Sequence, residues 1–173
     1  MIYHSDRYLG VEPLVLKSKQ LVLRARRRSE VEAWVASMSS ADQAHFSPAW
    51  LEQLAQSAES DPWILGFEVQ LEDGETAIGY AGFKGPPDSK GVVEIAYAID
   101  PEHQNRGFAT EASAVLVRYA LGQADVRAIR AHTLPETNAS TRVLTKMGFS
   151  NAGEVIDPDD GPVWRWEIVP RSR

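Results

Sequence analysis

A strand, a tight loop and a helix stand out near the middle of the chain. Val92 to Ile99 is mostly apolar and has the length of a strand, and the segment from about Gly107 to Leu121 repeats apolar residues at helical spacing. Between them, Gln104 to Ala109 has the pattern Gln-x-x-Gly-x-Ala. The other predicted elements flank this strand–loop–helix unit.

The part of the chain before this unit predicts antiparallel strands with two helices among them. Strands are predicted at Gln20–Arg24, Trp63–Leu71 and Thr76–Phe83. Helices are predicted at Glu30–Met38 and from Pro48 to about Ala58. Ser29-x-x-Glu32 has the pattern of a capping box and predicts the start of the first helix, and Ser47-Pro48 predicts the start of the second. Asp73-Gly74 is typical of a hairpin turn, so the sheet before Gln104 is largely antiparallel, which excludes a Rossmann start.

The part after the unit predicts a crossover followed by a closing hairpin. Further elements are predicted at Arg127–Thr133 (strand), Asn138–Met147 (helix), Phe149–Ile156 (strand) and Val163–Val169 (strand). The first of these strands follows a helix, so we expect it to lie parallel to the strand at Val92. The chain has no internal repeat or linker. We therefore expect residues 1–173 to form a single domain, with residues 1–19 as an N-terminal lead-in.

Composition narrows the classes of protein to consider. The chain has no cysteine, which excludes disulfides, thiolate catalysis and cysteine-bound zinc and favours a cytoplasmic location. Its four histidines are scattered without a His-Glu-x-x-His pattern, so we expect no metal site. A net charge of -6 disfavours nucleic acid and suits an amine substrate. The chain carries no apolar run that would span a membrane and no signal-peptide order at its start, so we expect no membrane association.

The central loop has the features of an anion site. Small residues let the backbone approach a ligand closely, and a helix that begins there directs free N–H groups and a positive dipole end toward it. Phosphate is the usual occupant of such a position. The glycine-rich dinucleotide and nucleoside-triphosphate loops are both absent from the chain.

Two segments in this order resemble the GNAT superfamily of acetyl-coenzyme A-dependent N-acetyltransferases. One is the Gln-x-x-Gly-x-Ala loop, and the other is Ser140 to Phe149, which has the pattern Ser-x-x-Val-Leu-x-Lys-x-Gly-Phe. The resemblance is strongest to the branch that includes the ribosomal-protein N-acetyltransferases. It covers about Leu21 to Ile168 in element order.

The resemblance implies an α+β (mixed α/β) fold in three layers. Its mixed sheet would have six to seven strands, splayed at the central strands, with about four helices. Acetyl-CoA, the acyl donor, would lie in that gap, with its pantetheine arm paired to the strand backbone and its pyrophosphate on the loop. The residues implied as cofactor-binding are Ala98, Ile99, Gln104, Asn105, Arg106, Gly107, Phe108, Ala109, Thr110, Asn138 and Ser140.

Glu94 is the first candidate for the catalytic base. An alkyl amine with a pKa near ~10 must lose a proton before it can attack a thioester. Glu94 is the one carboxylate in an apolar strand and shares a face with Ala96 and Ala98, whose small side chains leave space for a substrate. The resembled branch also has a glutamate proposed as base at this position. The alternative is a glutamate that points to solvent, whereas Tyr97 would lie on the opposite face in the core.

Ser140 is the candidate near the thioester sulfur, either as an acid for the leaving thiolate or as a cofactor contact. Asn138 would hold the pantetheine, although both residues would serve equally well as helix caps. The family commonly has Asn three residues before this serine, where this chain has Thr137, and the tyrosine acid of other branches is replaced by Leu144. His132 is left open between a second base, a substrate contact and a structural role.

The sequence thus predicts an N-acetyltransferase that joins acetyl-CoA and an amine in a ternary complex. Direct attack is expected because the chain has no cysteine and no serine in a nucleophile elbow. The acceptor amine would belong to a small molecule or a protein N-terminus, and a different acyl donor stays open. A non-catalytic acyl-CoA-binding sensor is the alternative, and a homodimer is compatible with the sequence.

Overall fold

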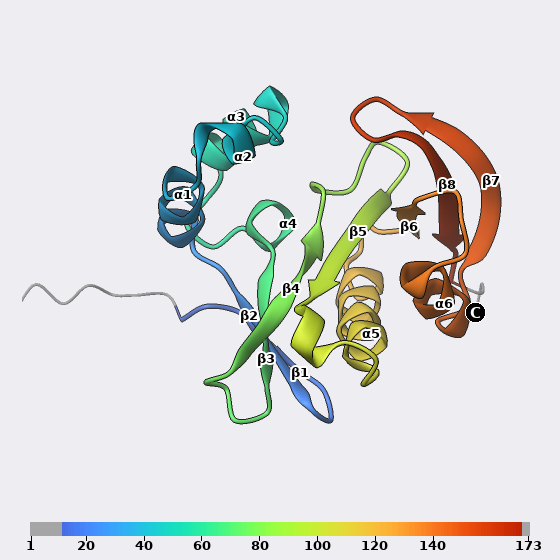
Figure 1. The fold of residues 1–173 in the computed structure, drawn as a ribbon, viewed down its shortest axis with the longest axis horizontal. Helices are drawn as coiled ribbons and strands as arrows, with labels where there is room; N and C mark the ends of the chain where they lie inside the picture. The colour runs from blue at the N-terminus through green and yellow to red at the C-terminus, as the bar shows by residue number, and fades with distance from the viewer. Residues whose placement is uncertain (1–11, 171–173) are drawn as a thin grey trace, which may run out of the picture.

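The computed structural model describes residues 12–170, and in that range the chain forms one sheet of eight strands, ordered β1-β2-β3-β4-β5-β6-β8-β7 (Figure 1). The strands are β1 (Val15–Lys17), β2 (Leu21–Ala25), β3 (Phe67–Leu71), β4 (Ala77–Phe83), β5 (Val92–Ile99), β6 (Ala128–Thr133), β7 (Ser150–Asp157) and β8 (Gly161–Ile168). The mixed sheet confirms the predicted fold class. The additional strand, β1, lies inside the expected lead-in, whose residues 1–11 fall outside the described range.

Six α-helices and one short 3-10 helix accompany the sheet in the described range. They are α1 (Arg28–Ala36), α2 (Ser40–Gln43), α3 (Pro48–Gln56), α4 (Pro62–Leu65), η1 (Pro101–His103), α5 (Phe108–Leu121) and α6 (Ala139–Lys146). The sequence predicted about four, because α2 and α4 are single turns with little periodicity of their own. Within residues 12–170, each helix is too short or too polar to cross a membrane.

The prediction of a strand from Trp63 to Leu71 is wrong at its beginning. Asp61 caps α4, where its carboxylate accepts a hydrogen bond from the Trp63 N–H at 2.9 Å, and Pro62 occupies the first turn. Gly66 then ends the turn with a φ of 65°, and β3 begins at Phe67. The apolar run therefore continues through a change from helix to strand.

The sheet opens between β5 and β6. These strands pair in parallel only from Val92 with Ala128 to Glu94 with Arg130. On its other side, β5 pairs with β4 from Ile95 to Ile99. The second half of β5 therefore has one paired edge and one edge that β6 does not cover, which leaves backbone hydrogen-bonding groups there for another partner.

Two apolar clusters hold the elements in place. The larger one joins the inner face of the sheet to α5, with Leu23, Phe67, Val93 and Leu116 among its buried members. A smaller cluster joins α1, α3 and α4 through Val31, Leu54, Ile64 and Leu65. Figure 1 shows these helices grouped at one end of β2 to β4, away from α5 and α6. The larger cluster includes Val93 and Ile95 of β5 and Ile129 of β6, so one apolar core continues across the opening between these strands.

Gly79 is required where β4 and β5 approach each other. A Cβ atom at this position would lie 2.2 Å from the Ala98 carbonyl oxygen, which belongs to the backbone and has little freedom to move. We expect Gly79→Ala to lower the free energy of unfolding by about 2–4 kcal/mol. Gly85 is a matched control, because its φ of 144° is close to the 156° of Gly79 while nothing lies within 4 Å of its Cβ position. Chemical denaturation of the two variants should show a much smaller loss for Gly85→Ala, and equal losses would contradict the close approach.

Candidate active site

A cavity of about 370 Å³ lies beside the open edge of β5. Three segments far apart in the sequence form its walls: the end of β5, the loop that leads into α5, and one face of α6. The lining residues are Tyr97, Ala98, Ile99, His103, Gln104, Asn105, Gly107, Phe108, Ala109, Thr110, Ala139, Ser140, Arg142, Val143 and Lys146. The cavity is therefore open to a ligand that runs along the strand and reaches the N-terminus of a helix.

The loop wall is shaped by two residues with left-handed backbone angles. Asn105 has a φ of 59° and Gly107 a φ of 84°, and α5 begins directly afterwards. The first helical hydrogen bond from this segment is that of the Glu111 N–H to the Gly107 carbonyl at 3.0 Å. The N–H groups of the first turn consequently have no intrahelical acceptor and face the cavity side of the loop. The Gln104 side chain fixes the loop by donating to the Ile99 carbonyl at 2.8 Å.

The α6 wall adds positive charge that sequence reasoning missed. Arg142 and Lys146 lie four residues apart, so they share the helix face that lines the cavity. Arg142 and Lys146 are both exposed, and neither forms an ion pair with another residue in the described range. The i, i+4 spacing of these two cations on the predicted helix was the signal that could have found them.

Two residues implied as cofactor-binding do not line the cavity. The Arg106 guanidinium lies over the ring of Phe108, 5.6 Å from the ring centroid. Asn138 is the N-cap of α6, where its side-chain oxygen accepts from the Thr141 N–H at 3.0 Å. Helix capping, the alternative weighed for Asn138, is thus the role that its contacts show. The other residues of that set, Ser140 included, line the cavity.

Tyr97 has two roles where the sequence predicted one. Its ring packs against the core cluster, as expected, but the side chain also lines the cavity beside Ser140. Burial raises the pKa of Tyr97 to about 12, an effect that the hydroxyls of Ser113 and Ser140 partly oppose. Strand alternation alone placed Tyr97 away from the site, because it says nothing of a helix that closes on the strand edge from the side.

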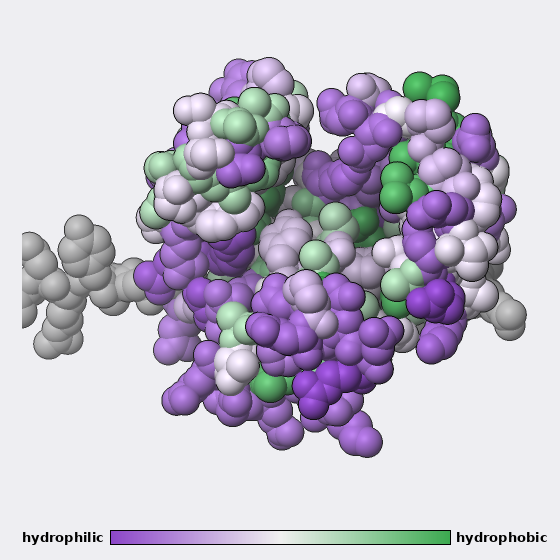
Figure 2. All heavy atoms as spheres, in the orientation of Figure 1, coloured by the Kyte–Doolittle hydropathy of each residue, from purple (hydrophilic) through white to green (hydrophobic). Residues whose placement is uncertain are grey.

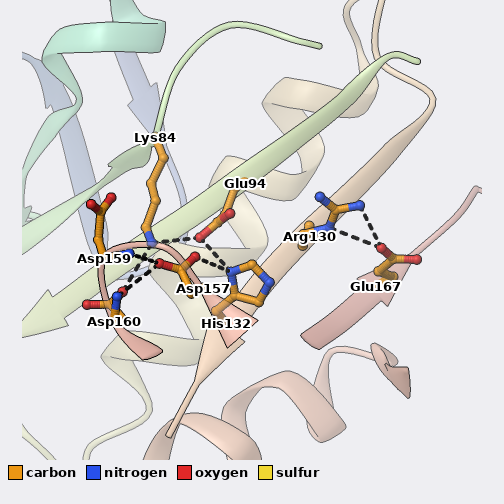
Figure 3. A network of polar contacts seen from close by, with 8 residues as sticks. All are labelled: Lys84, Glu94, Arg130, His132, Asp157, Asp159, Asp160 and Glu167. Carbon is orange, nitrogen blue, oxygen red and sulfur yellow. Dashed lines mark hydrogen bonds and ion pairs between the residues drawn. The ribbon is translucent and has the colours of Figure 1, made fainter. Parts of the chain in front are cut away.

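Glu94 lies outside this cavity, at the point where β5 and β6 part, and is held in a polar cluster (Figure 3). The Lys84 ammonium donates to Glu94 Oε1 at 2.8 Å, and His132 Nδ1 lies 3.1 Å from the same oxygen. Asp157 Oδ2 is 3.7 Å from His132 Nδ1. The cluster therefore joins β5, β6, β7 and the residue directly after β4, and no local sequence pattern links its members.

The charges in this cluster are stabilised by one another. Burial by itself would lower the pKa of Lys84, but the hydrogen bond and charge of Glu94 and the nearby aspartates raise it overall. Burial would likewise raise the pKa of Asp157, yet the N–H groups of Asp160 and Asp159 hold it below its usual range. Lys84 thus remains an ammonium and Asp157 a carboxylate around neutral pH.

Figure 2 shows the surface hollowed between the α1–α3 side and the β7–β8 hairpin.

A mixed sheet that opens beside one strand, with an N–H-rich loop at a helix N-terminus next to the opening, is the architecture of an acetyltransferase. Comparison with protein families agrees, since residues 9–150 match the model described as an acetyltransferase (GNAT) domain. The chain therefore belongs to the GNAT family.

Relatives of known sequence are named N-acetyltransferases. YjdG of Bacillus subtilis, an uncharacterized N-acetyltransferase, is 33% identical over 89 residues, which cover 51% of each chain. YoaA of the same species, also an uncharacterized N-acetyltransferase, is 28% identical over 151 residues, which are 80% of this chain and 84% of YoaA. The match with YjdG thus spans about half of that protein's length, whereas the match with YoaA spans most of both chains.

Among solved structures, the fold resembles the Rim-type ribosomal-protein acetyltransferases, in agreement with the predicted branch. RimJ of Mycobacterium smegmatis in complex with CoA-disulfide superposes with a TM-score of 0.64 at 20% sequence identity, over 91% of this chain and 88% of RimJ. At this identity the likeness concerns the fold.

Proposed function

We propose that the protein transfers an acetyl group from acetyl-CoA to a primary amine within a ternary complex. The observation that carries this proposal is the arrangement along β5. The strand has an open edge from Ile95 to Ile99, an anion-binding loop at one end and the carboxylate of Glu94 at the other. A strand rises about 3.3 Å per residue, so Glu94 lies about 10 Å from Tyr97 along the chain. This suits a linear thioester whose reactive end meets a second substrate.

Two features of the cavity support coenzyme A as its ligand. The open edge of β5 offers backbone groups to the amides of pantetheine, and the loop N–H groups offer donors to the pyrophosphate. No atom lies within 4 Å of the Cβ position of Gly107, so the loop leaves room where a ligand would approach its backbone. The structure of RimJ with CoA-disulfide supports the proposal, since that protein has the same fold.

The reaction requires a base for the acceptor amine and a proton for the leaving thiolate. Glu94 takes a proton from the ammonium form of the acceptor, and the freed nitrogen lone pair attacks the thioester carbonyl carbon. A C–N bond forms, the C–S bond breaks, and the sulfur leaves as a thiolate that takes the second amine proton. The products are an N-acetyl amide and coenzyme A, and Glu94 returns its proton to water. Ser140, beside Tyr97 in the cavity wall, relays this proton to the thiolate or binds the cofactor.

An amine screen tests this proposal. Purified protein at saturating acetyl-CoA is incubated with short peptides that have free N-termini, polyamines, aminoglycosides and amino-acid esters, and thiol release is followed. We expect amine-dependent thiol release matched by acetylated amine in mass spectra. Binding of acetyl-CoA without turnover of any amine would favour the sensor alternative.

We also infer that Arg142 and Lys146 hold the 3′-phosphate, since the loop already provides donors for the pyrophosphate. We expect Arg142→Gln and Lys146→Gln each to weaken acetyl-CoA binding by about tenfold. Calorimetry with acetyl-dephospho-CoA, which lacks this phosphate, should show little effect of either substitution. Lys90→Gln is the control, because it removes a lysine charge from an exposed position outside the cavity lining. Equal losses for the two ligands would contradict the 3′-phosphate assignment.

A further inference from the structure

The two oxygens of Glu94 have different surroundings. Both hydrogen-bond donors in the cluster, Lys84 Nζ and His132 Nδ1, approach Oε1. Oε2 accepts no hydrogen bond from any residue in the range 12–170, and Figure 3 shows it turned away from both donors. A carboxylate held in this way presents one chosen oxygen, with its lone pairs, to an incoming group.

The surroundings of His132 define which of its two ring nitrogens carries the hydrogen. Its side chain is only 9% exposed, and its Nε2 atom is buried without a hydrogen-bond partner among the described residues. Arg165 of β8 pairs with His132 in the sheet register, and its guanidinium has only donors and no acceptor to offer. A buried N–H without an acceptor costs about 1–3 kcal/mol, so the contacts assign the ring hydrogen to Nδ1. That hydrogen points at Glu94 Oε1.

Asp157 flanks the same ring nitrogen that Glu94 approaches. Its Oδ1 accepts the N–H groups of Asp159 and Asp160 at 2.9 and 3.0 Å, which leaves Oδ2 toward His132 Nδ1 at 3.7 Å. The turn between β7 and β8 therefore fixes the carboxylate that flanks the imidazole. His132 is the rigid donor to Glu94, whereas the Lys84 side chain is 46% exposed and supplies mainly charge.

We propose that His132 is a positioning residue for Glu94: its Nδ1–H, with Lys84, fixes Oε1 so that Oε2 is the atom that takes the acceptor's proton. This inference rests on the proposed function, because it assumes that Glu94 is the base. It assigns to His132 neither of the two direct roles, second base or substrate contact, that the sequence left open. The imidazole acts through Glu94 and does not meet the substrate.

Three substitutions at one position separate positioning from packing. The side-chain N–H of Asn can occupy the place of Nδ1, whereas that of Gln reaches the place of Nε2. With the best acceptor of the amine panel at saturating acetyl-CoA, we expect His132→Ala to lower kcat by about 10²-fold with unchanged acetyl-CoA affinity. We expect His132→Asn to recover at least about tenfold of that loss and His132→Gln to recover none of it.

Nitrogen NMR of the histidine rings tests the same contact without any acceptor. The chain has four histidines, and the His132→Asn variant identifies which signals belong to His132. We expect Nδ1 to give the signal of a protonated nitrogen and Nε2 that of a bare one, and we expect Glu94→Ala to perturb the Nδ1 signal.

Two results would overturn the inference. One is equal activity of the Ala, Asn and Gln variants, and the other is a hydrogen found on Nε2 in place of Nδ1. Because Asn and Gln differ by one methylene, their comparison stands even where the Ala variant is unstable. If Glu94→Gln leaves turnover unchanged, the proposed base is wrong. If Glu94→Gln is impaired while all His132 variants match the wild type, only the positioning role is wrong.

Discussion

Replacing Glu94 by Gln is expected to lower turnover by about 10²–10⁴-fold, the usual contribution of a general base. The amide keeps the size of the side chain and an oxygen for Lys84 and His132, but it has no lone pair basic enough to take a proton from an ammonium. Glu94 does not line the cavity, so we expect acetyl-CoA affinity to be unchanged. Steady-state kinetics with the best acceptor, together with calorimetry for acetyl-CoA, measure the two effects separately.

The control for this substitution is Glu154→Gln. Glu154 is an exposed carboxylate on β7, so its change alters the net charge equally without touching the opening between β5 and β6. We expect it to retain wild-type turnover. A Glu94→Gln enzyme with wild-type turnover at every pH would remove Glu94 from the role of base.

Gly107→Leu is expected to weaken acetyl-CoA binding by about 10²-fold or more. A side chain at this position would project from the loop backbone and displace a phosphate from the N–H groups, and hydrogen bonds to charged groups contribute about 1.5–3 kcal/mol each. The left-handed φ of 84° adds a cost of about 1–2 kcal/mol to folding for any residue with a Cβ. Calorimetric titration with acetyl-CoA measures the binding, and chemical denaturation measures the stability.

Gly74 provides a matched control for the backbone cost. It lies between β3 and β4, has a φ of 71° and, like Gly107, has nothing within 4 Å of its Cβ position. We therefore expect Gly74→Leu to lose similar stability while it binds acetyl-CoA normally, because Gly74 does not line the cavity. Normal binding by Gly107→Leu would contradict the assignment of the loop to the pyrophosphate.

Local signals predicted much of the fold. The central strand, the long helix after it and the hairpin at Asp73-Gly74 follow from periodicity and turn chemistry, and all three are present. The failures lie where two signals compete. Trp63 to Leu65 is apolar and was assigned to a strand, but the Asp61-Pro62 start signal prevails and forms α4. The three-residue edge strand β1 is too short for any period to identify.

The candidate site could also be predicted only where its residues are consecutive in the sequence. The loop from Gln104 to Thr110 could be located because its chemistry lies in consecutive residues. The contacts of Glu94 could not be predicted, since Lys84 comes from the end of β4, His132 from β6 and Asp157 from β7. The sequence predicted the strand on which Glu94 lies, but it did not predict which residues orient Glu94.

A crystal structure of the protein with coenzyme A tests the central claim most directly. The pantetheine arm should run along the open edge of β5 beside Tyr97 to Ile99, with the pyrophosphate on the N–H groups of the loop at Gly107. The sulfur should lie toward Ser140 and the opening at Glu94. Coenzyme A bound elsewhere, or with its sulfur directed away from Glu94, would contradict the account.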